Sequence, residues 1–122
     1  MSPRKNELGQ PIGPLLPDWK APSPPQRAPM VGRYCRVEPI DAARHAEDLY
    51  RANAADPSRR NFTYLTIGPF DTLDAYREWM ASASRSEDPL FHAIIDADTG
   101  KAAGIASFMR IDTKNGVIEI GN

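Results

Sequence analysis

Three short apolar segments separated by turn signals constrain the fold of this chain most strongly. Residues 90–96 are rich in Ile and Phe, residues 102–112 form the longest segment, and residues 117–122 form the third. Asn115-Gly116, between the second and third segments, is the strongest hairpin signal, because both residue types tolerate positive φ. The pattern predicts a three-stranded antiparallel meander, and its third strand has no later segment to cover it. We therefore expect half of a domain.

Two amphipathic helices are expected between a first strand at residues 33–38 and this meander. Asp41 can cap the first helix, which Asp56-Pro57 should end because the residue before proline disfavours the helical conformation. Asp71 or Thr72 can cap the second, which should run to about residue 83. These elements indicate an α+β fold. The expected buried stripes are Ala42, Ala46, Leu49, Tyr50 and Asn53 in the first helix, and Leu73, Tyr76, Met80 and Ala83 in the second.

A proline-rich arm precedes the folded part. Eight of the twelve prolines lie within the first thirty residues, and proline fixes φ and donates no backbone hydrogen bond. We expect residues 1–31 to be extended and residues 32–122 to form the domain. Two alternatives remain for the arm: a disordered tail, or a segment that docks on the domain through Leu15, Leu16 and Trp19.

Composition excludes several classes of protein. The net charge is −1, with basic and acidic residues spread evenly, so no electrostatic argument favours nucleic acid or an anionic membrane surface. No apolar run approaches the roughly 20 residues that a membrane helix needs, and the N-terminus does not have a secretory pattern. Cys35 is the single cysteine and, with only His45 and His92, cannot build a zinc site. We expect a cytoplasmic protein without a metal.

Few side chains suggest chemistry on their own. His92 lies between apolar residues and is expected to be a hydrogen-bonded core histidine, whereas His45 has polar neighbours and is expected on the solvated surface. Phe62, Tyr64 and Phe70 cluster between the helices. These aromatic residues either cap the core beneath that loop or form the wall of a substrate pocket, since binding residues concentrate on loops.

Glu119 is the acidic residue of greatest interest. It alternates with Ile118 and Ile120 along the third meander strand, so it faces away from them. It is either an ordinary outward-facing acid or a functional group.

The order of these elements resembles the N-terminal half of an enzyme of the GNAT superfamily of N-acetyltransferases. The details are similar to the branch of ribosomal-protein N-acetyltransferases. The resemblance covers essentially the whole chain. It rests on residues 9–13 with 17–19 in the arm, on residues 63–70 between the helices, and on residues 88–91, 104–107 and 116–121 in the meander.

The resemblance implies transfer of an acetyl group from acetyl-coenzyme A to an amine acceptor, either a small molecule or a protein. It implies backbone donors at Ile120, Gly121 and Asn122 for the thioester carbonyl, and Glu119 as the acceptor of the amine proton. Tyr64 and Phe70 would contact the substrate. The chain departs from the family pattern at Phe62, where tryptophan is expected, and at Asn122, where relatives often carry histidine.

The same resemblance implies a glycine-containing pyrophosphate loop directly after the strand of Glu119, and residues 1–122 do not include one. We therefore expect a truncated enzyme that is weakly active or inactive and binds acetyl-coenzyme A weakly. The alternative is a non-catalytic interaction module that pairs with another chain, including a second copy, through the exposed edge of residues 117–122.

Overall fold

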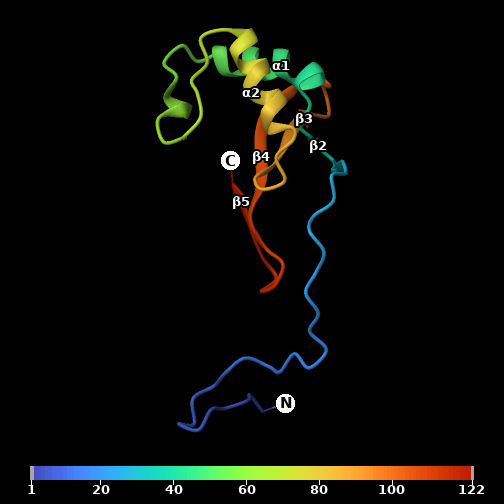
Figure 1. Ribbon diagram of the computed structural model, residues 1–122, viewed down its shortest axis with the longest axis vertical. Helices are drawn as coiled ribbons and strands as arrows, with labels where there is room; N and C mark the ends of the chain where they lie inside the picture. Colours follow the sequence, from blue (N-terminus) through green and yellow to red (C-terminus); the bar gives the residue numbers. More distant parts are fainter. Residues whose placement is uncertain (1, 122) are drawn as a thin grey trace.

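The computed structural model describes residues 2–121 and has the predicted α+β architecture (Figure 1). Along the chain the elements are β1 (Met30–Val31), β2 (Cys35–Pro39), α1 (Ala42–Ala54), the 3₁₀ helix η1 (Arg60–Phe62), α2 (Leu73–Ala83), β3 (Leu90–Asp96), β4 (Ala102–Asp112) and β5 (Val117–Gly121). The bounds predicted for β3 and β4 are confirmed, and β5 ends within the described residues at Gly121. Neither α-helix between residues 2 and 121 has the length and apolar character needed to cross a membrane.

The sheet has five strands in the order β1-β2-β3-β4-β5, and each pair is antiparallel. The prediction of one strand before the helices was therefore wrong, because β1, which lies within the predicted arm, pairs with β2. The β1 ladder joins only Met30 to Val37 and Val31 to Arg36. A segment of two residues is too short to show the alternation that identifies a strand in a sequence.

Both helices begin where the sequence predicted. The Asp41 side chain accepts a hydrogen bond from the Arg44 N–H, and Thr72 Oγ1 accepts one from the Ala75 N–H. Each bond satisfies one of the backbone donors that a helix leaves free in its first turn. The apolar stripes pack on one face of the sheet. The buried apolar cluster contains Ile40, Ala46, Leu49, Tyr76, Met80, Ala93, Ile95 and Ala102.

The strand register separates two faces of the sheet. Phe91 is paired with Ser107, and it packs against Trp79 of α2, so these residues lie on the face that the helices cover. His92 lies on the opposite face, where its ring meets the edge of Phe108 at a centroid distance of 5.3 Å. The expectation of a core histidine is confirmed, because His92 is buried and its Nδ1 lies 3.1 Å from the Leu90 carbonyl oxygen.

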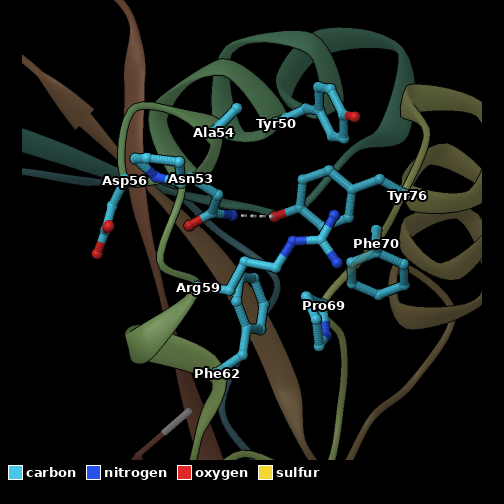
Figure 2. Close-up of a pocket in the computed structure, with 10 residues that line it drawn as sticks. Tyr50, Asn53, Ala54, Asp56, Arg59, Phe62, Pro69, Phe70 and Tyr76 are labelled. Atoms are coloured by element: carbon cyan, nitrogen blue, oxygen red, sulfur yellow. Dashed lines mark hydrogen bonds between the residues drawn. The ribbon is translucent and has the colours of Figure 1, made fainter.

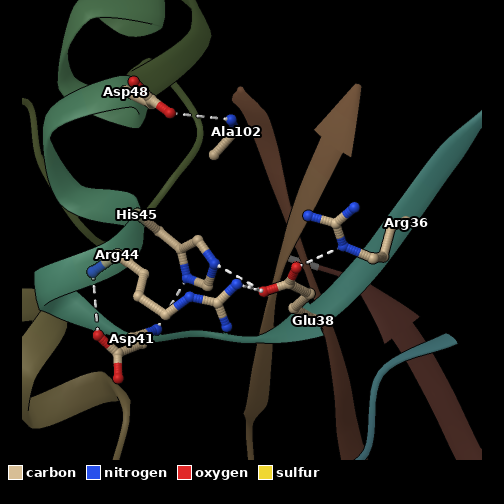
Figure 3. A network of polar contacts seen from close by, with 7 residues as sticks. All are labelled: Arg36, Glu38, Asp41, Arg44, His45, Asp48 and Ala102. Atoms are coloured by element: carbon tan, nitrogen blue, oxygen red, sulfur yellow. Dashed lines mark hydrogen bonds and ion pairs between the residues drawn. The ribbon is translucent and has the colours of Figure 1, made fainter. Parts of the chain in front are cut away.

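The expectation for His45 was wrong. This histidine is buried between α1 and β2, where its Nε2 lies 3.2 Å from Oε2 of the buried Glu38 (Figure 3). The Asp41 N–H donates to His45 Nδ1, so Nε2 carries the proton and donates to Glu38. Arg36 and Arg44 also pair with Glu38. The histidine is buried because a buried carboxylate on β2 requires hydrogen-bond donors, a demand that the pattern of α1 alone does not reveal.

The arm contacts the domain at one end of the β4–β5 hairpin. The Trp19 ring lies directly against Gly116, and Pro22 and Pro25 face Val117 and Ile118 across a small cavity. Of the three residues expected to dock, Trp19 makes this contact, although it is still 52% exposed. The prediction is wrong for Leu15 and Leu16, which stay 67% exposed.

Candidate functional site

The loop between α1 and α2 forms two adjoining cavities, of about 230 and 240 Å³. The first lies among the end of α1, the loop and the start of α2 (Figure 2). The second continues towards Ile105 on the helix-covered face of β4. Four residues line both cavities, so they form one continuous wall: Asn53, Phe62, Phe70 and Tyr76.

An aromatic cluster forms much of this wall. The Phe70 ring centroid lies 4.9 Å from that of Tyr76 and 5.6 Å from that of Trp79. Tyr76 and Trp79 are three residues apart on α2, which brings their rings to the same side of the helix, and they stack at 5.8 Å. Phe70 was predicted to contact substrate, and it lines both cavities.

Hydrogen bonds link the polar groups of the wall. Asn61 Nδ2 donates to Asn53 Oδ1, and Asn53 Nδ2 donates to the Tyr76 hydroxyl, at 3.2 and 3.4 Å. Burial raises the pKa of Tyr76 to about 12. The Tyr76 hydroxyl therefore remains protonated at neutral pH and can donate a hydrogen bond to a ligand.

Arg59 is a cavity residue that the sequence did not reveal. Its backbone is left-handed, with φ 57° and ψ 23°, and its side chain runs towards Tyr76 and Phe70 (Figure 2). Arg59 Nη1 forms an ion pair of 2.9 Å with Asp71. Nearby, hydrogen bonds from Ser58 lower the pKa of Asp56, so that carboxyl is ionised at neutral pH. A lone arginine in a loop gives no periodic signal, and nothing in the pattern could have identified it.

Tyr64 lies elsewhere. Its side chain is 97% exposed, and it is not among the residues that line the two cavities. The structure therefore brings Phe62 and Phe70 together, while the role predicted for Tyr64 stays a prediction. Phe62 packs closely on Gly68, whose φ of +69° turns the chain back towards α2.

The other predicted site residues lie on β5, at the edge of the sheet. Glu119 pairs with Met109, and its Oε2 lies 3.4 Å from Arg110 Nε. Because β5 pairs only with β4 among the described strands, every other backbone N–H of β5 points to an open edge. Ile120 is 74% exposed, Gly121 faces Ser107, and Asn122 lies outside the described residues.

A β-bulge holds this end of the hairpin. The register shifts between Met109 and Asp112, and Arg110 adopts a positive φ of 48°. The two backbone N–H groups of Arg110 and Ile111 donate to the two oxygens of Asp88, at 2.9 and 3.1 Å. Asp88 therefore fixes the bulge from which Arg110 reaches Glu119.

The cavities and Glu119 share one face of the sheet. Ile105, Ser107 and Met109 alternate along that face, and the last two are paired with Gly121 and Glu119. Met109, the partner of Glu119, lies four steps beyond Ile105 on β4, which is about 13 Å along the strand. A ligand in the cavities could thus extend along the face towards Gly121. Among residues 2–121, there is no group of three or more His, Cys, Asp and Glu that could hold a metal ion.

Comparison with known proteins gives related solved structures. A GCN5-related N-acetyltransferase from Brucella melitensis is 42% identical, with a TM-score of 0.83 over 88% of this chain and 48% of its own. A probable acetyltransferase of the GNAT family from Chromobacterium violaceum is 30% identical, with a TM-score of 0.76 over 93% of this chain and 56% of its own. A third solved structure, 23% identical with a TM-score of 0.60, shares the fold.

The chain spans about half the length of these relatives. No protein-family model matches the sequence, and no curated protein matches it either. The solved relatives are GNAT-family acetyltransferases, which supports the GNAT superfamily for this chain.

Proposed function

We propose that this chain provides the acceptor cavity and one wall of the acetyl site of an N-acetyltransferase that uses acetyl-coenzyme A. The 42% identity to an N-acetyltransferase structure over 88% of the chain carries this proposal. Within the superfamily, the motifs of the arm and of residues 63–70 favour the branch of ribosomal-protein N-acetyltransferases. The acceptor is an amine that enters from the side of the aromatic cavities.

These roles come from the resemblance to the family, and the position of β5 at the edge of the sheet supports them. Of the neighbouring residues Ile120 and Gly121, the one whose backbone N–H points to the open edge polarises the thioester carbonyl, since a donor aimed at a developing oxyanion stabilises the transition state. The amine nitrogen forms a bond to the carbonyl carbon, the carbon–sulfur bond breaks, and the coenzyme A thiolate leaves. Glu119, about half exposed beside this edge, accepts the proton that the amine loses.

We expect residues 1–122 alone to bind acetyl-coenzyme A weakly. Helix N-termini that bind phosphate usually follow a glycine-rich loop. In the described chain α1 follows β2 through Ile40 and Asp41, and α2 follows Phe70, Asp71 and Thr72. Neither N-terminus offers such a loop. Calorimetry should give a dissociation constant weaker than micromolar, and a micromolar value would contradict this expectation.

The proposed function is tested by acetyl transfer to a panel of amino acids, polyamines and peptides at millimolar acetyl-coenzyme A, with mass spectrometry as the readout. Glu119→Gln should lower the yield of acetylated amine about 100-fold, because a general base contributes at least that much. Glu78→Gln, an exposed acid on α2, is the matched control and should equal the wild type. Equal, measurable yields from the wild type and Glu119→Gln would contradict the proposal.

A second candidate function is an interaction module. The open edge of β5 and the exposed side chains of Ile118 and Ile120, 46% and 74% exposed, favour strand pairing with another chain or a second copy. Light scattering at increasing concentration tests the pairing of two copies. A monomer at all concentrations would count against self-association through β5.

A further inference from the structure

Arg59 has hydrogen-bonding capacity that the protein itself does not use. Among the described residues its guanidinium pairs only with Asp71, through Nη1, which leaves donors on Nε and Nη2. The Asp71 side chain is 82% exposed, so water competes for this ion pair and screens it. The guanidinium can therefore turn to a ligand at small cost.

The backbone at Arg59 supports a functional role. Its φ of 57° lies in the left-handed region, which glycine and asparagine adopt more easily than arginine. Residues held in such conformations concentrate at binding and active sites. The chain thus places a charged residue at a position where its backbone is disfavoured and its side chain lines a cavity.

The cavity around Arg59 suits an anion with an apolar body. Phe62, Phe70 and the Tyr76 ring supply apolar walls, and the Tyr76 hydroxyl supplies a neutral donor. Asp56 also lines this cavity, but its Oδ1 accepts both hydrogen bonds from Ser58, and its carboxylate points away from Arg59 (Figure 2).

We propose that Arg59 binds a carboxylate of the acceptor, so that the substrate is an amine that also carries a carboxylate next to an apolar group. A short peptide with an aromatic C-terminal residue has this chemistry, and its N-terminal amine can extend along the face of the sheet towards Glu119. The planar guanidinium fork matches a carboxylate and can donate two parallel hydrogen bonds. The assignment of the ligand as acceptor rests on the proposed function, whereas the anion site itself does not.

Two probes isolate the carboxylate: 3-phenylpropanoate and 3-phenylpropanamide, which share an aromatic body and differ in charge. Binding is followed by NMR through the side-chain amide of Asn53, which lines the cavity, at physiological ionic strength and without acetyl-coenzyme A. The wild type should bind the carboxylate at least tenfold more tightly than the amide, as expected for hydrogen bonds to a charged group.

Three variants test the residue. Arg59→Met should bind both probes equally, and Arg59→Lys should keep part of the preference because lysine retains the charge but loses the fork. Arg60→Met removes the same charge from the next residue, which is exposed and outside the residues that line the cavity, and should behave as the wild type. Equal binding of the two probes by the wild type, no shift at Asn53 with either probe, or an equal loss in Arg60→Met and Arg59→Met would overturn the proposal.

Arg59→Gly separates binding from folding. Because glycine adopts the left-handed conformation freely, this variant should melt at or above the temperature of the wild type while it loses the carboxylate preference. A lower melting temperature with the preference retained would mean that Arg59 is only structural. If the wild type prefers the carboxylate but gives the same measurable acetyl transfer as Glu119→Gln, the anion site is supported and the proposed function is contradicted. If Glu119→Gln lowers acetyl transfer but the wild type binds both probes equally, the proposed function is supported and the anion site is contradicted.

Discussion

The buried carboxylate of Glu38 provides the most direct test of how α1 is attached to the sheet. Its side chain is only 6% exposed and pairs with Arg36, Arg44 and His45. Glu38→Gln keeps the shape and one acceptor oxygen but removes the charge. The amide of glutamine cannot serve all of these donors, so the variant should be less stable than the wild type.

The expected loss of stability depends on which partners of Glu38 are buried. The side chains of Arg36 and Arg44 are 41% and 62% exposed, so water can hydrate their charges when Glu38 is replaced. The His45 side chain is 3% exposed, and a buried donor without a good acceptor costs about 1–3 kcal/mol. This value is below the roughly 3–5 kcal/mol for breaking a fully buried ion pair. For a domain of this size each kcal/mol lowers the melting temperature by about 4–8 °C.

The pH dependence has a defined sign. The hydrogen bond from Arg36 lowers the pKa of Glu38 below its ordinary value of 4.5, despite the opposing effect of burial. The unfolded chain therefore binds the proton more readily, so the stabilisation is complete above about pH 4.5 and is lost as the pH falls through the folded pKa. The stability difference between the wild type and Glu38→Gln should be largest at pH 7 and should shrink at acid pH.

Thermal and urea unfolding of both proteins between pH 7 and pH 3 measure this difference. The matched control is Glu47→Gln, which removes an exposed acid of α1 that pairs with Arg51. The control should lose less than about 0.5 kcal/mol, as is typical of exposed pairs. A Glu38→Gln variant as stable as the wild type at pH 7, or a difference that does not change with pH, would refute the reasoning.

Two further changes test the β4–β5 hairpin. Asp88→Ala leaves the N–H groups of Arg110 and Ile111 without their carboxylate partner, and because these groups lie near solvent the free energy of unfolding should fall by only about 1 kcal/mol. Hydrogen exchange of the two amides should accelerate, and unchanged exchange would contradict this. Gly116→Ala should cost about 1–2 kcal/mol because φ is +64° there. It should also displace Trp19, whose fluorescence should shift to longer wavelength; an unchanged spectrum would show that the arm does not depend on this contact.

Local signals explain why so much of the fold could be predicted. The ends of β3 and β4 and the caps of both helices depend on turn residues, capping side chains and periodicity, which the sequence displays directly. β1 could not be predicted, because a ladder of two residues is set by its partner strand. His45 was assigned to the surface because its burial depends on Glu38, a residue on another element.

The candidate site was less predictable, because its residues are placed by the path of the loop and by contacts between elements. Phe70 could be predicted as a candidate site residue, because aromatic residues in a loop either cap the core or form the wall of a pocket. Phe70 lines both cavities. Tyr64 has the same character but is exposed, and only the path of the loop decides between the two. Arg59 depends on a left-handed backbone and a tertiary cavity, and neither leaves a trace in the pattern of residues.

The proposed function requires that the open edge of β5 receives the acetyl group of acetyl-coenzyme A. Titration of millimolar acetyl-coenzyme A into the ¹⁵N-labelled protein tests it directly, because weak binding is still visible as shifts of individual backbone amides. We expect the largest shift at the amide of Ile120 or Gly121, whichever points to the open edge, and smaller shifts at the neighbouring amides of β5. Shifts confined to the arm, or β5 amides that do not move at all, would contradict it.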